Sequence, residues 1–173
     1  MPLADQLIKH ARFLVDLDPV APQEVNLRRA VSAAYYAAFH LLSAAVAEQM
    51  SPSAPLGLRG RTQRALDHGV MARAADLFKS SGKPITGVPD DIGHSDLISP
   101  KLARIAGDFK DLQQNRFIAD YDILDKRNVV NYVWASGYVA KAEQLFLDWK
   151  DEQGTDNAKV FLAALMLTGK WTK

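Results

Sequence analysis

The chain contains no cysteine among its 173 residues, which excludes disulfides, thiolate zinc sites and cysteine nucleophiles. No run approaches the roughly 18 uninterrupted apolar residues of a membrane span, and residues 1–6 lack the charged-then-apolar pattern of a secretory signal. No phosphate-binding loop, dinucleotide-binding glycine fingerprint, His-Glu-x-x-His pair or serine-triad signature is present. We therefore expect a soluble cytoplasmic protein without a metal, a cofactor or a membrane partner.

The chain also has little excess charge, since its formal net charge is +1. A polyanion would therefore have to be bound by a local patch and not by the field of the whole molecule. The proportions of hydrophobic residues (48%) and charged residues (24%) are those of an average globular protein. This composition predicts a single domain over residues 1–173.

Apolar residues recur at helical spacing along most of the chain, and no stretch shows the alternation of a β-strand. The pattern predicts an all-α bundle of four to five core helices, with a short extra helix at the C-terminal end. The expected helices run from Leu3 to a stop at Asp18-Pro19, from Pro22 or Asn26 to Met50, from Thr62 to Phe78, from Ser99-Pro100 past Arg116, from Asp125 to Asp151, and from Asp156 to Leu167.

Residues 79–99 form an interruption of about 20 residues with no helical periodicity, where most connections are less than half as long. Such a long loop is usually mobile or functional. Its end at Ser99-Pro100 is typical of an N-cap followed by proline at the first helical position.

A row of polar residues interrupts the alanine-rich second helix. Burial of hydroxyl, imidazole and guanidinium groups without partners costs a few kcal/mol each, so the row must face a partner helix, a second subunit or a wet cleft. Its members follow one another at steps of three and four, which places them on one face: Arg29, Ser32, Tyr36, His40 and Ser43.

Three sequence runs together resemble the HEPN superfamily, in its small stand-alone branch. They are Arg29-Ala-Val-Ser-Ala-Ala-Tyr-Tyr-Ala-Ala-Phe-His40, then His68-Gly-Val, and finally Arg116-Phe-Ile-Ala-Asp-Tyr121. The resemblance covers the chain from about Leu3 to about Trp149. The order and combination of the three runs carry it, since each run alone is weak.

The resemblance implies a helical bundle that commonly forms a two-fold dimer. Many HEPN proteins are metal-independent RNA endonucleases, often toxins encoded beside a nucleotidyltransferase-type partner protein. Their active site pairs an arginine, which neutralises the scissile phosphate, with a histidine four to six residues later, which moves the proton of the ribose 2′-hydroxyl. Here Arg116 matches the arginine, but Tyr121 occupies the histidine's place and no histidine follows His94.

Two interpretations of these residues remain open. In one, Arg116 holds a phosphate and His40 replaces the missing imidazole as proton carrier. In the other, His40 is structural and Arg116 pairs with Asp120 in a buried polar network. We expect the arginine and the polar row to converge on one pocket. The candidate catalytic residues are Arg116, His40 and Tyr121, and the candidate positioning or substrate-binding residues are Arg29, Ser32, Tyr36, Asp120 and His68.

Two functions follow from these interpretations. The first is an RNA- or nucleotide-binding homodimer that acts as a metal-independent endoribonuclease of toxin–antitoxin type. The second is a non-catalytic dimerisation or protein-interaction module that has lost activity together with the signature histidine.

Overall fold

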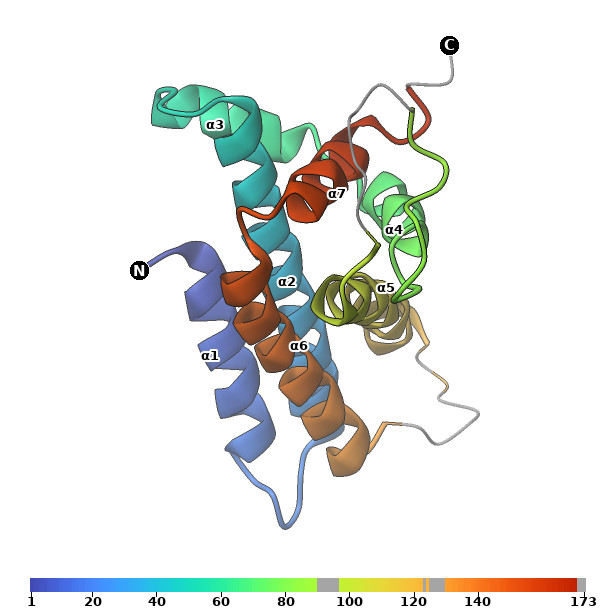
Figure 1. Cartoon of the computed structure of the whole chain (residues 1–173). Coiled ribbons are helices and arrows are strands. Elements are labelled where there is room, and N and C mark those ends of the chain that lie inside the picture. Colours follow the sequence, from blue (N-terminus) through green and yellow to red (C-terminus); the bar gives the residue numbers. More distant parts are fainter. Residues whose placement is uncertain (90–96, 123, 125–129, 171–173) are drawn as a thin grey trace.

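The computed structural model describes residues 1–89, 97–122, 124 and 130–170, and these residues form an all-α bundle (Figure 1). The prediction of an all-α bundle is confirmed. The described residues contain seven helices, namely α1 (Leu3–Asp16), α2 (Glu24–Met50), α3 (Leu56–Arg64), α4 (His68–Asp76), α5 (Pro100–Tyr121), α6 (Tyr132–Glu152) and α7 (Asp156–Leu167).

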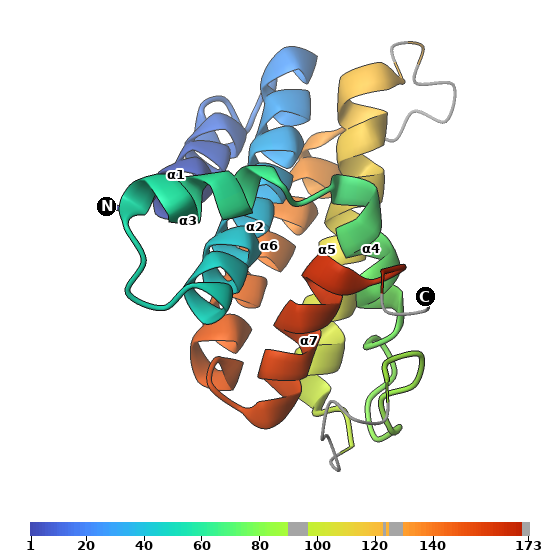
Figure 2. The same ribbon diagram turned by 90° about the horizontal axis from the view of Figure 1, so that it is seen from above.

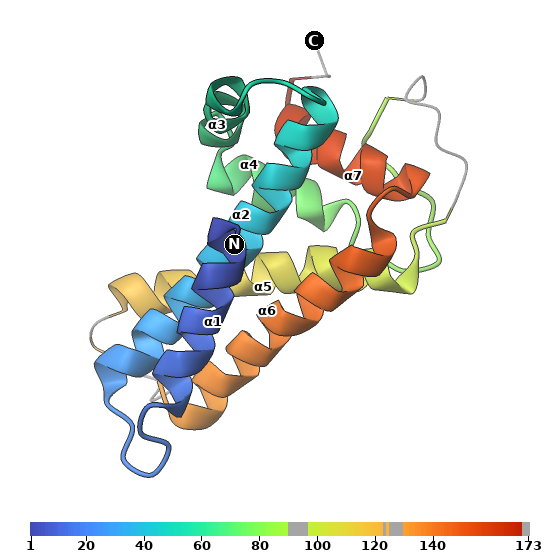
Figure 3. The ribbon, with the colours of Figure 1, turned by 90° about the vertical axis from the view of Figure 1, so that its left-hand side faces the viewer.

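Helix α2 forms the centre of the bundle. It packs against α1, α5 and α6, with α5 crossing it at an angle, and against α3 and α7 near its C-terminal end (Figures 1 and 3). Alanines make up much of its surface, and five of them between Ala30 and Ala38 are buried. Small side chains allow neighbouring helices to approach closely, so α2 can be surrounded on several sides.

The third predicted helix, from Thr62 to Phe78, is wrong as a single element. The chain forms α3, breaks at residues 65–67, and restarts as α4. Asp67 causes the restart because its side chain accepts a hydrogen bond from the backbone N–H of Val70 at 2.8 Å, as an N-cap does. Thr62 lies inside α3 and is not an N-cap, since its hydroxyl donates to the carbonyl of Leu58.

The starts of α5 and α6 also follow local capping chemistry. Ser99 accepts from the N–H of Leu102 at 3.0 Å, which confirms the predicted start of α5. Helix α6 begins at Tyr132 with Asn131 as its N-cap, later than the predicted start at Asp125. Residues 125–129 lie outside the described part of the chain.

The described ends of the predicted loop at 79–99 are held against the bundle. Ile98 donates its N–H to the carbonyl of Lys83 at 2.9 Å, and its own carbonyl accepts from Gly82 at 2.9 Å. Ile85 and Ile98 are buried in the core. Residues 90–96, the middle of the predicted loop, lie outside the described residues.

Helices α4 and α7 form a second, shorter layer across one end of the long helices (Figure 2). The two helices pack directly on each other, and Phe78, just after α4, meets Phe161 of α7 edge-on at 5.1 Å between ring centroids. Helix α7 has the predicted bounds and serves as the short C-terminal addition to the bundle.

Helix α2 is the one described helix that is long and apolar enough to cross a membrane, judged by length and composition alone. Of its most apolar window, 72% is buried inside the bundle. An apolar helix at the centre of a helical bundle is buried in the same way.

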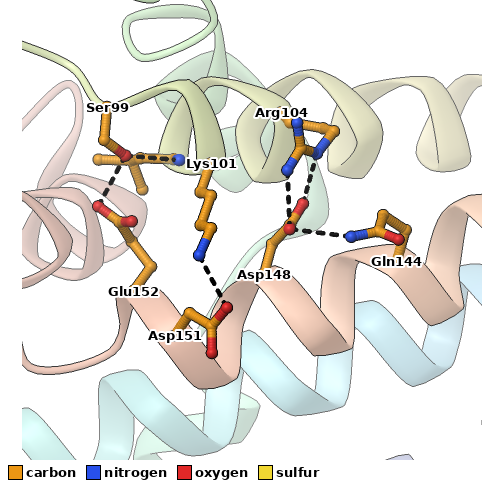
Figure 4. Close-up of polar contacts among 8 residues, drawn as sticks. Ser99, Lys101, Arg104, Gln144, Asp148, Asp151 and Glu152 are labelled. Carbon is orange, nitrogen blue, oxygen red and sulfur yellow. Dashed lines mark hydrogen bonds and ion pairs between the residues drawn. The ribbon is translucent and has the colours of Figure 1, made fainter.

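Helices α5 and α6 are clamped together by a row of polar contacts (Figure 4). Arg104 donates from Nε and Nη2 to the two carboxylate oxygens of Asp148, at 2.6 and 2.8 Å. Asp148 is 3% exposed while Arg104 is 45% exposed, so the pair joins a buried carboxylate to a partly solvated cation. Ser99 with Glu152 and Lys101 with Asp151 extend the row toward the end of α6.

We predict that Arg104→Gln lowers the free energy of unfolding by about 2 kcal/mol, because it leaves a buried carboxylate without its cation. Urea unfolding near neutral pH measures the change. Lys101→Ala is the matched control on the same helix, and it should change stability little because its partner Asp151 is exposed.

The difference in the free energy of unfolding between wild type and Arg104→Gln should also depend on pH. The hydrogen bonds from Arg104 lower the pKa of Asp148. The stabilisation is therefore complete above the pKa of an unfolded aspartate, about 3.9, and is lost as the pH falls through the lower folded pKa. A gap that stayed constant between about pH 6 and pH 3 would contradict this role for the pair.

Candidate functional site

Arg116 of α5 meets the polar row of α2 in the interior of the bundle. Its Nη2 donates to the hydroxyl of Tyr36 at 2.8 Å, and its Nε lies 2.8 Å from Oδ2 of Asp120. Ser32 donates its hydroxyl to the same carboxylate oxygen at 3.4 Å. The side chains of Arg116 and Asp120 are 20% and 16% exposed. Four members of the expected network therefore lie in contact: Arg116, Asp120, Tyr36 and Ser32.

Three tyrosine rings surround the guanidinium of Arg116. Its Cζ lies 5.3 Å from the ring centroid of Tyr36, 5.5 Å from that of Tyr121 and 5.9 Å from that of Tyr35. Cation–π attraction therefore adds to the ion pair with Asp120. The Nε atom is buried and has no hydrogen-bond partner within the described residues, so the ion pair leaves one donor of the guanidinium unsatisfied.

His68 brings an imidazole to the same cluster from the first turn of α4. Its Nδ1 shares a short hydrogen bond with the hydroxyl of Tyr35, and its ring stacks on Phe39 at 4.1 Å between centroids. Gln113 of α5 donates to the backbone carbonyl of His68 at 3.1 Å. The ring is thus fixed by two side chains of α2, the backbone of His68 is held by α5, and Nε2 is the nitrogen left for a ligand.

The electrostatic surroundings of His68 favour its neutral form. Burial lowers the pKa of His68, and the positive charge of Arg116 lowers it further. A neutral imidazole is the form that can accept a proton. His68 was expected to be a positioning residue, and it is the imidazole whose pKa responds to Arg116.

His40 lies one turn beyond Tyr36 on α2. It makes no hydrogen bond or ion pair within the described residues, and its ring meets Phe39 edge-on at 5.6 Å. Burial lowers the pKa of His40 as well. Its side chain lines a cavity of about 790 Å³ that His68 also lines.

The expectation that Arg116 and His40 share one pocket is wrong for the described residues. Arg116 lines a separate hollow of about 300 Å³ with Gln113, Gln114 and Phe117, and neither His40 nor His68 lines it. Ring contacts connect the two residues only indirectly, since Tyr36 meets His68 edge-on at 6.0 Å and Phe39 contacts both histidines.

The remaining candidates lie toward the end of α5. Arg29 is exposed, and together with Asp120 and Tyr121 it lines a third hollow of about 390 Å³. Tyr121 is 58% exposed and packs on Phe117 at 5.0 Å between ring centroids. Ser43 is buried and donates to the carbonyl of Phe39 in its own helix, so it has no part in the Arg116 cluster.

Three contributors were not expected from the sequence. Tyr35 and Phe39 look like core residues on the apolar face of α2, yet they hold the ring of His68. Arg28 donates to the carbonyls of Ile118 and Ala119 at 3.0 and 3.2 Å, at the negative end of the α5 dipole. The adjacent pair Tyr35-Tyr36 was the available signal, because neighbouring helical residues point toward different partners.

No group of three or more His, Asp or Glu side chains within the described residues could hold a metal ion. The chemistry that the cluster offers is therefore that of an arginine, an imidazole and phenolic hydroxyls. These groups suit binding of a phosphate and transfer of a proton.

We predict that Arg116→Gln raises the pKa of His68, because it removes a positive charge that disfavours the imidazolium ion. Titration of the histidine ring signals by NMR measures the shift. His40 is an internal control, since burial alone lowers its pKa, and that pKa should stay where it is. A His68 pKa that did not move would show that Arg116 does not act on the imidazole.

The same titration carries a stability consequence. A folded pKa below the unfolded value of about 6.5 means that the folded state binds fewer protons, so stability falls as the pH drops through that window. Arg116→Gln brings the folded pKa of His68 closer to its unfolded value, which narrows the pH range between the two. The free energy of unfolding that His68 costs the protein in acid should therefore decrease.

Comparison with known proteins identifies no relative. No family model, no curated protein and no solved structure matches the chain. Its function therefore has to be inferred from the contacts of Arg116, His68 and their neighbours.

Proposed function

We propose that this chain is a HEPN-like protein that binds RNA or a nucleotide and acts as a metal-independent endoribonuclease of toxin–antitoxin type. The observation that supports this function is the position of His68, an imidazole bonded to Tyr35, whose ring lies 5.9 Å from the partly buried guanidinium of Arg116. The missing signature histidine is thereby replaced from a different helix. The role first assigned to His40 passes to His68.

The proposed reaction needs one base, one acid and one cation. Nε2 of neutral His68 accepts the proton of a ribose 2′-hydroxyl, and the 2′-oxygen attacks the adjacent phosphorus. The bond to the 5′-oxygen breaks, and that oxygen takes a proton from an acid, which leaves a 2′,3′-cyclic phosphate and a 5′-hydroxyl. Arg116 stabilises the negative charge on the phosphate oxygens during the transfer.

The neighbours of these two residues hold them in place. Tyr36 and Asp120 orient the guanidinium, Ser32 orients Asp120, and Tyr35 determines which nitrogen of His68 is free. His40 shares the cavity with His68, and burial lowers its pKa, so it lines the site as a neutral second imidazole and the leaving 5′-oxygen takes its proton from water. The exposed Arg29 and Tyr121 are placed to contact RNA beyond the scissile phosphate.

We also propose that the chain forms a homodimer through this face of the molecule and works in the cytoplasm with a nucleotidyltransferase-type partner protein. The polar row remains half-exposed at Tyr36 and His40, and the exposed rings of Phe117 and Tyr121 lie next to it on α5. A second copy packed here would cover both the polar row and the aromatic pair.

A non-catalytic interaction module is the alternative, and one observation favours it. The charge of Arg116 is already matched by Asp120 within the same chain, and Tyr36 satisfies its Nη2. A phosphate would have to share or displace Asp120 in order to reach the guanidinium. In this alternative the cluster serves to join α2 to α5 and to shape the docking face.

We predict that the purified protein cleaves mixed RNA in the presence of EDTA, and that His68→Ala and Arg116→Ala each reduce the rate by about 100-fold or more. The physical reason is the loss of the proton acceptor in one variant and of the phosphate cation in the other. Gel analysis of end-labelled RNA measures the rates. His10→Ala is the matched control. This variant should cleave RNA like wild type, because His10 is exposed on α1.

Rates that were equal in wild type and both variants would remove His68 and Arg116 from the mechanism. If wild type itself cuts no RNA, the catalytic proposal fails and the interaction module is favoured.

We predict that the protein elutes as a dimer, at twice its chain mass of 19.1 kDa, in size-exclusion chromatography with light scattering. Under the interaction-module alternative, Tyr36→Ala or His40→Ala should change the oligomeric state or lower the melting temperature, while neither variant nor wild type cuts RNA. His10→Ala again serves as control. A monomer at all concentrations would contradict the dimer.

A further inference from the structure

A cavity that His40 and His68 line extends to apolar side chains and to Arg64, which the proposed cleavage does not use. It has a volume of about 790 Å³ and lies between the start of α1, the C-terminal half of α2, α3 and the end of α6. This size falls within the range of about 300–1,000 Å³ that is typical of small-molecule sites.

The walls of the cavity are mainly apolar. The lining includes Leu3 of α1, Phe39 and Leu41 of α2, Leu66 between α3 and α4, and Trp149 of α6. An apolar wall with a few convergent polar groups is the usual form of a small-molecule site. The body of a matching ligand is therefore aromatic or aliphatic.

Charge is distributed unevenly around the cavity. Arg64, at the end of α3, is exposed and has no ion pair or hydrogen bond within the described residues. Glu48 is neutralised by an ion pair with Arg59, whereas Asp5 lies on the α1 side of the cavity. An anionic group is thus attracted to the α3 side and repelled from the α1 side.

Helix α3, on one side of the cavity, is loosely attached to the bundle. None of the nine residues of α3 is buried, and the helix packs mainly on the C-terminal part of α2 (Figure 1). Its position therefore depends on few contacts, and a ligand beneath it can recruit Arg64 without disturbing the core.

We propose that this cavity binds an amphipathic monoanion, a small molecule whose apolar body lies against Phe39 and Leu66 and whose single acidic group pairs with Arg64. His40 and His68 line the cavity as hydrogen-bonding groups. Burial lowers the pKa of both imidazoles, which leaves Arg64 as the cation that selects the ligand. This site does not depend on RNA cleavage.

The probe for this site is 1-anilinonaphthalene-8-sulfonate, whose emission rises when it enters an apolar pocket. We predict saturable binding of one probe per chain, with energy transfer from the tryptophan in the wall, Trp149. Arg64→Gln should weaken the binding about fivefold to tenfold, because it removes the partner of the sulfonate. Arg61→Gln is the matched control on the same helix and should bind like wild type, since Arg61 is exposed and does not line the cavity.

A second variant tests the position of the probe. Ala44 is exposed and lines the cavity, so the indole of Ala44→Trp can fill the space without entering the buried core. Binding should be lost in this variant, and circular dichroism melting shows whether each variant is folded. If Ala44→Trp does not fold, the comparison of Arg64→Gln with Arg61→Gln decides.

Competition identifies the class of ligand. Displacement of the probe by decanoate supports the proposal. Displacement by adenosine monophosphate at lower concentration than decanoate would overturn it and assign the cavity to a nucleotide. The proposal also fails if the probe shows no saturable binding, or if Arg64→Gln and folded Ala44→Trp bind it like wild type.

Discussion

The rest of the structure depends on the burial of α2 at the centre of the bundle. A helix that is surrounded on several sides must find a partner for each polar side chain it carries, because an unpaired buried hydroxyl costs on the order of 1–3 kcal/mol. Ser32 and Tyr36 meet this requirement on α5, through Asp120 and Arg116. Tyr35 meets it on α4, through His68.

The same requirement builds the candidate site. Tyr35 and Tyr36 are neighbours in sequence, yet one bonds to His68 and the other to Arg116, so a single turn of α2 holds an imidazole and a guanidinium from two different helices. A site made from contacts that also stabilise the core is rigid before any ligand arrives. A substitution at any of these residues is therefore expected to change stability as well as any function of the site.

Helical periodicity and capping residues predicted the class of fold and most of the helices. The break between α3 and α4 was missed because residues 64–67 contain neither glycine nor proline. An aspartate such as Asp67 also occurs within helices and on their surfaces, so by itself it is a weak signal of a helix start. Periodicity also identified the polar face of α2. It could not show where along that face α5 crosses. Ser32 and Tyr36 do lie at the crossing with Arg116, but His40 lies one turn further along α2 and lines a different cavity.

The contacts of His68 could not be predicted from the sequence for a different reason. The signature spacing of arginine and histidine describes one way to place an imidazole near a guanidinium, along a single helix. Proton transfer requires only that the groups lie at the right distance and that the imidazole is neutral, so another helix can supply the ring. Here Asp67 starts α4 at the point where its first residue reaches Tyr35, and the charge of Arg116 helps to keep the ring neutral. Tyr121, in the place where the motif has its histidine, instead lies with its ring centroid 5.5 Å from the guanidinium carbon of Arg116.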